Sequence, residues 1–273
     1  MWHRAYDGGA GEVAQVVGAM TALRELAGER GLLLVGDSKL LWRGNIIAMH
    51  QARVGFIAPA AKPYLPAARL GALDPKAATA VDYVAERDQG SPAEQRGSYR
   101  VLEGAITLAG KRKADADLAV RCVFVWSWAR AQAAAQSRTK KLDRARDELQ
   151  RVQRGLGGPH YQTPAKVADR VQTIARARKL GGLLCAQVGT DPATGKPTLS
   201  WSFDQAALAA EQATDGWYGL VTNLSVEQAD AAEILRRYKG QEVVERRYGT
   251  FKGPLAVAPM FLKDNRRIAA LSA

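Results

Sequence analysis

The sequence predicts an α/β fold that is interrupted by a mixed α and β insertion, and three observations lead to this prediction. A helix-periodic segment at 11–30 runs into a short apolar segment that ends at Asp37, which is typical of a buried strand. A second helical stretch at 41–52 and a second apolar run at 54–58 complete a β-α-β unit. The segment that follows, 60–213, is too long for a loop between two elements of one compact domain.

The composition fits an ordinary globular chain of one large domain or two. The chain has 273 residues, of which 47% are hydrophobic and 24% are charged. It contains no run of 18 apolar residues, and its first residues, MWHRAYDGG, lack the basic and apolar regions of a signal peptide. We therefore expect a cytoplasmic protein with no membrane partner. Cys122 and Cys185 stand in apolar, strand-like contexts, which predicts two buried thiols without a disulfide or a zinc site.

The expected domains are a first part of the core at 1–59, an insertion at 60–213, and a return to the core at 214–273. Inside the insertion, apolar and β-branched patterns predict strands and helical periodicity predicts two basic helices. These strands are expected at 98–106, 118–127, 181–189 and 197–203, and these helices at 129–154 and 164–180. A strand at 215–223 leads back to the core, and Ser225 with Gln228 is expected to form a capping box for the next helix.

The positive charge is concentrated in one segment. The net charge is +12, and residues 127–182 hold 13 Lys and Arg against 4 Asp and Glu, an excess of nine. Such a stripe is typical of proteins that bind a nucleic-acid backbone. Lys140, Lys141 and Arg144, on the longer basic helix, are the candidate backbone contacts. The alternative is a solvated helix face, and RNA or a membrane surface would suit the same charge.

A spaced set of polar residues stands near the C-terminus. At offsets of 0, 3, 7 and 14, the set comprises Tyr238, Gln241, Glu245 and Lys252. At about 100° per residue these offsets fall within an arc of about 60° on one helix face. One carboxylate is thus held among groups suited to phosphate, provided that the helix continues through the glycine at 240, which costs about 1 kcal/mol in a helix interior.

The alternative for this segment is an amphipathic helix without chemistry. In that case Tyr238, Val244 and Phe251 face a core, and the Arg and Glu side chains are solvated.

The spacing of the set resembles the Y-x2-R-x3-E-x6-K signature of insertion-sequence transposases of the DDE type. The segment LLLVGDSKL, followed by a helix and VGFIAP, resembles the region around the second catalytic aspartate of that family, which corresponds to Asp37 here. The pattern DG-x-Y-x-L-x-T-N at 215–223 is also similar to the family. The resemblance covers 1–58 and 214–271, and the middle of the chain only loosely.

The resemblance implies a fold, a reaction and a set of site residues. The fold is a ribonuclease-H-like core, incomplete here, and the reaction is cleavage and strand transfer of transposon-end DNA. Asp37 and Glu245 would be catalytic ligands of Mg²⁺ or Mn²⁺, because two divalent ions can stabilise the attacking and leaving oxygens of an in-line displacement. DNA contacts would come from Tyr238, Gln241 and Lys252. Trp217, or Tyr218 beside it, could stack on an extruded base, the alternative being an aromatic on a half-buried strand.

The partners implied are the terminal inverted repeats of transposon DNA and a second copy of the chain, as a homodimer in the DNA complex. The chain also departs from the family pattern. Gln241 stands where arginine is usual, and a neutral amide cannot grip phosphate with a planar cationic fork. For the first catalytic aspartate the segment before the first helix offers only Asp7, which predicts a partial copy.

Three functions therefore stay open at this point. The first is a metal-dependent transposase. The second is a catalytically inactive, basic DNA-binding remnant of one. The third is a basic helical adaptor in which the signature spacing is accidental.

Overall fold

The computed structural model describes residues 12–28, 31–85, 88–92, 96–110 and 116–252, and it shows a mixed α/β fold. The chain divides into two compact units. The sheet unit comprises Met1–Leu65, Ala77–Val125 and Tyr218–Ala273, and the inserted unit comprises Pro66–Lys76 and Trp126–Trp217.

The main sheet has six strands within the described residues, in the order β1-β2-β8-β5-β4-β3. Their bounds are β1 Leu33–Val35, β2 Gly55–Pro59, β3 Thr79–Val81, β4 Tyr99–Leu108, β5 Leu118–Ser127 and β8 Trp217–Thr222. β1 and β2 are parallel, while β2 pairs with β8, and β3 with β4, in antiparallel fashion. The sheet is therefore mixed, and its parallel pair stands at one end.

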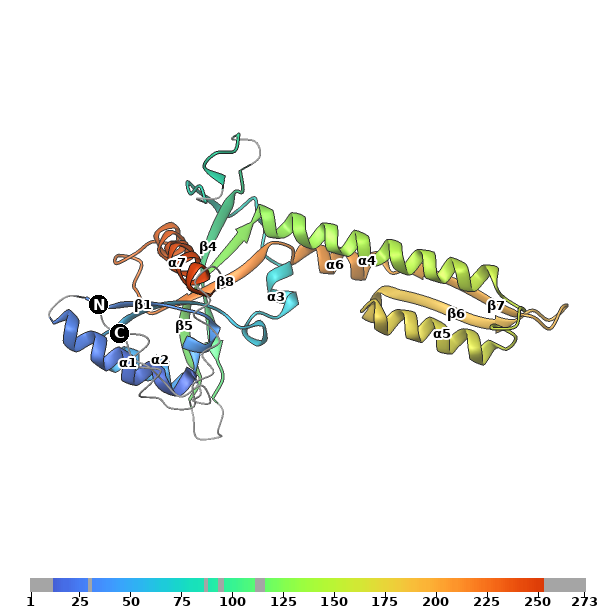
Figure 1. Ribbon diagram of the computed structural model, residues 1–273, viewed down its shortest axis with the longest axis horizontal. Coiled ribbons are helices and arrows are strands. Elements are labelled where there is room, and N and C mark those ends of the chain that lie inside the picture. Colours follow the sequence, from blue (N-terminus) through green and yellow to red (C-terminus); the bar gives the residue numbers. More distant parts are fainter. Residues whose placement is uncertain (1–11, 29–30, 86–87, 93–95, 111–115, 253–273) are drawn as a thin grey trace. The chain divides into compact units, whose positions relative to one another are not determined.

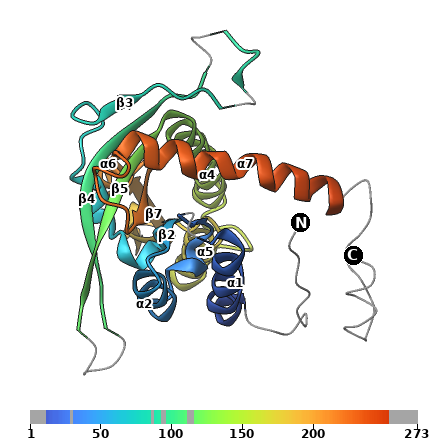
Figure 2. The same cartoon turned by 90° about the vertical axis from the view of Figure 1, so that its left-hand side faces the viewer.

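Helices cover both faces of this sheet. They are α1 Glu12–Ala27, the short 3-10 helix η1 Ser38–Leu41, α2 Arg43–Gln51 and α7 Ala231–Lys252. A second 3-10 turn, η2, spans Lys62–Tyr64. α1 and α2 pack together on one face, and α7 packs against β1, β2 and β4 on the other (Figures 1 and 2). The connection from β1 to β2 thus crosses one face of the sheet as a β-α-β unit.

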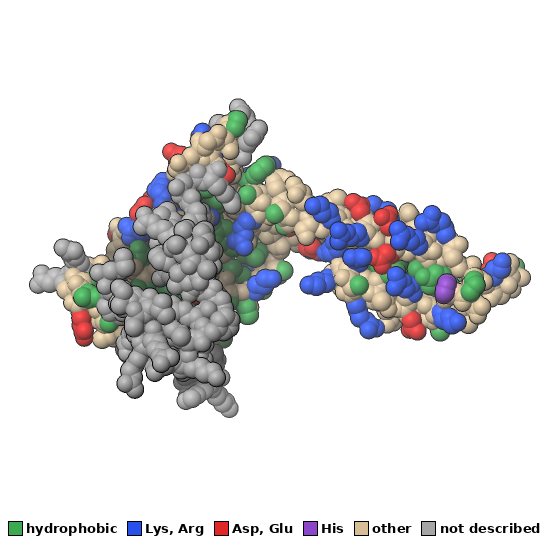
Figure 3. Space-filling view, in the orientation of Figure 1, with side chains coloured by type: hydrophobic (Ala, Val, Ile, Leu, Met, Phe, Trp, Pro, Cys, Tyr) green, Lys and Arg blue, Asp and Glu red, His purple; other side chains and the backbone are tan. Residues whose placement is uncertain are grey.

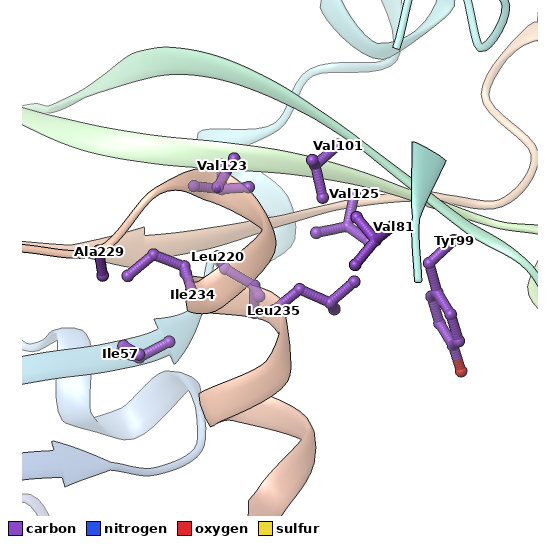
Figure 4. Packing of buried hydrophobic residues seen from close by; sticks show 11 residues of the cluster. Ile57, Val81, Tyr99, Val101, Val123, Val125, Leu220, Ala229, Ile234 and Leu235 are labelled. Atoms are coloured by element: carbon purple, nitrogen blue, oxygen red, sulfur yellow. The ribbon is translucent and has the colours of Figure 1, made fainter. Parts of the chain in front are cut away.

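The core of the sheet unit lies between the strands and the first turns of α7. Ile234 and Leu235 of α7 are fully buried and point toward strand residues such as Ile57, Val123 and Leu220 (Figure 4). The side chain of Asn223 secures the end of β8 to β2, because it accepts a hydrogen bond from the Phe56 N–H (2.9 Å) and donates one to the Val54 carbonyl (2.9 Å). Burial of this apolar layer fixes α7 against the sheet.

The inserted unit consists of helices and a two-stranded sheet. Its elements are α3 Ala67–Gly71, α4 Trp128–Arg154, α5 Pro164–Ala177, the 3-10 turn η5 Gly181–Leu183, β6 Leu184–Thr190, β7 Pro197–Phe203 and α6 Gln205–Ala213. α4, α5 and the antiparallel β6–β7 pair enclose a second core. Each of the helices α4, α5 and α6 begins at a side-chain cap, provided by Ser127, Thr163 and Asp204.

The two ends of the segment 127–216 meet. The Ser127 N–H donates a hydrogen bond to the Gly216 carbonyl (3.0 Å). Gly216 has φ +83°, and a Cβ there would lie 2.8 Å from the Ser127 carbonyl oxygen and 2.9 Å from the Trp126 Nε1. Only glycine fits this position.

The units divide the chain differently from the expected domains. β4 and β5 are expected inside the insertion at 60–213, and no strand is predicted at β3, yet all three extend the same sheet as β1, β2 and β8. Alternating apolar residues predict a strand but not the sheet that it joins. The inserted unit is accordingly shorter than expected, and α3 and α6 are helices that the pattern did not predict.

One expectation about the cysteines is wrong. Both are free, and Cys122 is buried as predicted, but Cys185 is exposed on β6. β6 and β7 form a sheet of only two strands, so one face of β6 remains open to solvent. Among the helices in the described ranges, none combines the length and apolar character needed to cross a lipid bilayer.

Candidate functional site

Asp37 stands two residues after the end of β1 and is exposed. Its Oδ1 accepts a hydrogen bond from the Lys39 N–H (2.8 Å), so the side chain caps η1. Its Oδ2 accepts no hydrogen bond from any residue that the structure describes, and a carboxylate oxygen of this kind is a donor suited to Mg²⁺. Asp37 therefore has a local structural role and one oxygen to offer to a ligand.

α7 is one continuous helix through Gly240. The spacing of the C-terminal set is therefore the spacing of a single helix, as the sequence interpretation assumed. The helix begins with a cap, since the Asp230 Oδ1 accepts a hydrogen bond from the Glu233 N–H (2.7 Å). Ser225 and Gln228 form the reciprocal hydrogen bonds of the expected capping box, from Ser225 N–H to Gln228 Oε1 (2.9 Å) and from Gln228 N–H to Ser225 Oγ (3.4 Å), but these bonds close the turn before α7, and Asp230 caps the helix instead.

The structure describes the side chains of only two of the four residues in the C-terminal set. The Tyr238 side chain is half-buried and packs against the core of the sheet unit, and the Gln241 side chain is also half-buried. The side chains of Glu245 and Lys252 lie outside the described part of the structure. Asp7, the candidate for the first aspartate, also lies outside the described residues.

At the level of elements, β1 and α7 belong to the same unit and pack against each other. This is the arrangement that a site shared by Asp37 and Glu245 requires. Where side chains are described, no three His, Cys, Asp or Glu residues are grouped so that they could hold a metal ion. The shared site of Asp37 and Glu245 stays a prediction.

Arg121 positions the chain segment that leads into α7. Its Nη1 donates hydrogen bonds to three backbone carbonyls, those of Leu224 (2.9 Å), Ser225 (3.1 Å) and Ala229 (2.8 Å). Its Nε and Nη2 donate to the Glu103 carboxylate on β4 (3.1 and 2.5 Å). The sequence interpretation missed Arg121, although a single arginine inside the apolar run LAVRCVFV was a signal for such a role.

The three candidate backbone contacts on α4 do lie together. Lys140, Lys141 and Arg144 line one cavity of about 290 Å³ in the inserted unit. The structure adds residues that the sequence interpretation did not name as contacts, namely Ser137, Ala177, Arg178 and Lys179. Lys and Arg side chains gather over this unit in the space-filling view (Figure 3).

Part of the basic stripe is neutralised inside the inserted unit. Arg138 is only 6% exposed and forms a two-pronged ion pair with Asp215, in which Nη1 lies 3.1 Å from Oδ1. The hydrogen bonds to Asp215 raise the pKa of Arg138 further above its ordinary value, although burial acts in the opposite direction. Arg138 is therefore a structural cation and is not available to DNA.

Trp217 is buried, with 6% of its surface exposed, and it stands at the start of β8. Its indole Nε1 is buried and has no hydrogen-bond partner within the described residues. Tyr218 is half-buried and packs against the core of the sheet unit. The Trp217 ring has no open face for an extruded base, so the structure favours for Trp217 the alternative of an aromatic on a half-buried strand.

A comparison with protein-family models gives no match for this chain, and neither does a comparison with curated proteins.

Proposed function

We propose that the protein acts on DNA as a transposase of the DDE type, with a ribonuclease-H-like core in the sheet unit. The observation that carries the proposal is the packing of β1, which ends two residues before Asp37, against α7, which bears Glu245, in one unit. The parallel pair β1–β2 with its crossover supports it, because ligands of open α/β sheets bind beyond the carboxyl ends of parallel strands.

In this proposal the two units have separate tasks. Asp37 and Glu245 would hold Mg²⁺ or Mn²⁺, which supplies charge stabilisation at the reacting phosphodiester when bound. Tyr238, Gln241 and Lys252 would contact the transposon end, and Lys140 and Arg144 of α4 would hold the backbone. Two copies of the chain would assemble on the terminal inverted repeats.

A second candidate is a DNA-binding remnant without catalysis. The cap that Asp37 provides to η1 favours it, because a local structural role accounts for this aspartate without any metal. In that case the DNA contacts of the inserted unit remain and the cleavage step is absent.

The test distinguishes the effect of losing the negative charge of Asp37 from the effect of losing its cap on η1. Asp37→Asn removes the negative charge but leaves an oxygen that can accept the Lys39 N–H, since asparagine is as good a cap as aspartate. Asp204→Asn is the matched control, because Asp204 caps α6 by accepting the N–H groups of Ala206 (2.8 Å) and Ala207 (3.0 Å). The assay is nicking of a labelled duplex with and without Mg²⁺, next to DNA binding at several salt concentrations.

We expect Mg²⁺-dependent nicking that is lost in Asp37→Asn and Glu245→Gln and kept in Asp204→Asn. Salt-sensitive DNA binding without nicking in the wild type would support the remnant instead. A wild-type protein that binds no DNA would refute both.

A further inference from the structure

Lys179 adopts a backbone conformation that favours glycine. Its φ is +51°, and it follows Arg178, the C-cap residue of α5. The turn is closed by hydrogen bonds from the Lys179 N–H to the Arg176 carbonyl (3.1 Å) and from the Leu180 N–H to the Ala175 carbonyl (2.9 Å). This is the helix-ending motif in which glycine is the usual residue. A lysine here is locally disfavoured, so replacing it by glycine should not destabilise the turn.

The side chain of Lys179 lines the cavity of about 290 Å³ described above. On the opposite wall, α4 contributes Ser137, Lys140, Lys141 and Arg144, while Arg178 stands beside Lys179. The cavity thus lies between α4 and the end of α5, two helices that pack against each other within one unit.

Two of these cations already have carboxylate partners. Lys141 Nζ lies 3.2 Å from Glu211 Oε1, and Arg178 Nε donates to Glu148 Oε1 (2.8 Å). Lys140, Arg144 and Lys179 form no side-chain hydrogen bond or ion pair with the residues that the structure describes. Three cations that form no ion pair within the described residues thus line one cavity, and their mutual repulsion would be relieved by an anion with several oxygens.

The cations continue along α4 beyond the cavity. Ser137, Lys140, Arg144 and Arg151 stand at offsets of 0, 3, 7 and 14, which places them on one face of the helix, and Glu148 on the same face is paired with Arg170 and Arg178. Arg151 is exposed. From Lys140 to Arg151 the helix rises about 16 Å, enough to follow several phosphates of one DNA strand. This row suits a polyanion better than a single phosphate ion.

We propose that the cavity between α4 and the end of α5 binds a backbone phosphate of DNA, with Lys179, Lys140 and Arg144 as its cationic ligands and the Ser137 hydroxyl as a further donor. The proposal rests on the proposed function, in that the inserted unit holds DNA. It adds a defined phosphate site and the residue Lys179.

The test uses Lys179→Gly in the full chain. Because glycine is the preferred residue at this φ, the variant should be at least as stable to heat as the wild type. Its DNA affinity should nevertheless fall several-fold, and the slope of log affinity against log salt should become shallower by about 1. Lys140→Gln and Arg144→Gln should change DNA binding in the same direction.

The chain provides a matched control in Arg53. Its φ is +54°, and it follows α2 in the sheet unit. The same motif closes its turn, with hydrogen bonds from the Arg53 N–H to the His50 carbonyl (3.1 Å) and from the Val54 N–H to the Met49 carbonyl (2.9 Å). Arg53→Gly removes one positive charge and adds one favourable glycine, so it should gain stability and keep the wild-type salt slope.

The outcomes separate the two proposals. If the wild type binds DNA and Lys179→Gly binds it equally well, the phosphate site is refuted while the proposed function stands. Equal losses in Lys179→Gly and Arg53→Gly would show a general charge effect and also refute the site. Calorimetry with inorganic phosphate, and competition between RNA and DNA of one sequence, complete the test. Tight phosphate binding without an effect of Lys179→Gly on DNA, or a clear preference for RNA, would overturn the assignment to DNA.

Discussion

Asp37 has a structural role as the cap of η1 and is also a candidate metal ligand. Its Oδ1 is engaged by the Lys39 N–H, while its second oxygen is open. A catalytic test that replaces Asp37 by alanine would therefore change the fold and the chemistry together.

We expect Asp37→Ala to lower the free energy of unfolding by about 1 kcal/mol, the usual cost of a lost cap, and Asp37→Asn to leave it nearly unchanged. Denaturant unfolding of the two variants measures this difference. Equal losses in both would mean that the charge, and not the cap, stabilises η1.

The lowered pKa of Asp191 should make the stability of the folded protein depend on pH. Hydrogen bonds from the N–H groups of Ala193 (2.8 Å) and Thr194 (3.1 Å) lower the pKa of Asp191 below its ordinary value. A lowered pKa in the folded state stabilises the fold fully above the ordinary pKa of about 3.9. This contribution is lost as the pH falls through the lower folded value.

The difference in unfolding free energy between the wild type and Asp191→Asn should therefore shrink as the solution becomes strongly acidic. Carboxyl titration of Asp191 by NMR measures the shift directly. An Asp191 titration at the ordinary pKa would contradict the prediction.

Residue types alone predicted some of these roles and not others. The basic stripe indicated Lys140, Lys141 and Arg144 as DNA contacts, and the structure places all three around one cavity, while their contact with DNA stays a prediction. The same count included Arg138, which turned out to be buried against Asp215. Nothing local in the sequence pairs two residues that stand 77 positions apart.

At the scale of elements, α7 depends on the segment that precedes it. Arg121 holds three carbonyls of this segment with one guanidinium nitrogen and Glu103 with the others. The helix that bears Glu245 is thus anchored to β4 and β5 before it begins.

Arg121→Ala should reduce the free energy of unfolding by about 2–3 kcal/mol, because it leaves several acceptors without a donor. Glu103→Gln is the control, since it keeps the carbonyl contacts and should cost much less. Hydrogen exchange at Ala231–Leu235 should accelerate in Arg121→Ala only. Unchanged exchange there would show that the core contacts alone fix α7.

Periodicity predicted most helices and strands to within a few residues. The expected strands at 118–127 and 197–203 coincide with β5 and β7. The partners of the strands could not be predicted, because side-chain alternation carries no information about which sheet a strand joins. β4 and β5 therefore appeared to belong to the insertion, although they form the middle of the main sheet.

At the scale of the whole molecule, each unit has its own core, so we expect each unit to have its own free energy of unfolding. Leu149 is fully buried in the core of the inserted unit, and the sheet unit has its own core around Ile57 and Leu220. Units with separate cores can open independently.

Leu149→Ala should destabilise the inserted unit by about 2–5 kcal/mol, through the lost burial and the cavity it leaves. Native-state hydrogen exchange should then accelerate in α4, α5, β6 and β7 and remain unchanged in β2 and β8. Ile57→Val in the sheet unit is the reciprocal control. Parallel acceleration in both units after Leu149→Ala would show that they unfold together.

The hydrogen bond between Ser127 and Gly216 affects which changes in length the segment between them can tolerate. β5 and β8 are neighbours in the sheet. The chain leaves the sheet at the end of β5 and returns at the start of β8, and one backbone hydrogen bond joins these two positions. Insertions and deletions between these positions should therefore leave the spacing of the strand ends unchanged, provided that α6 keeps its contact with α3, which precedes them in the chain.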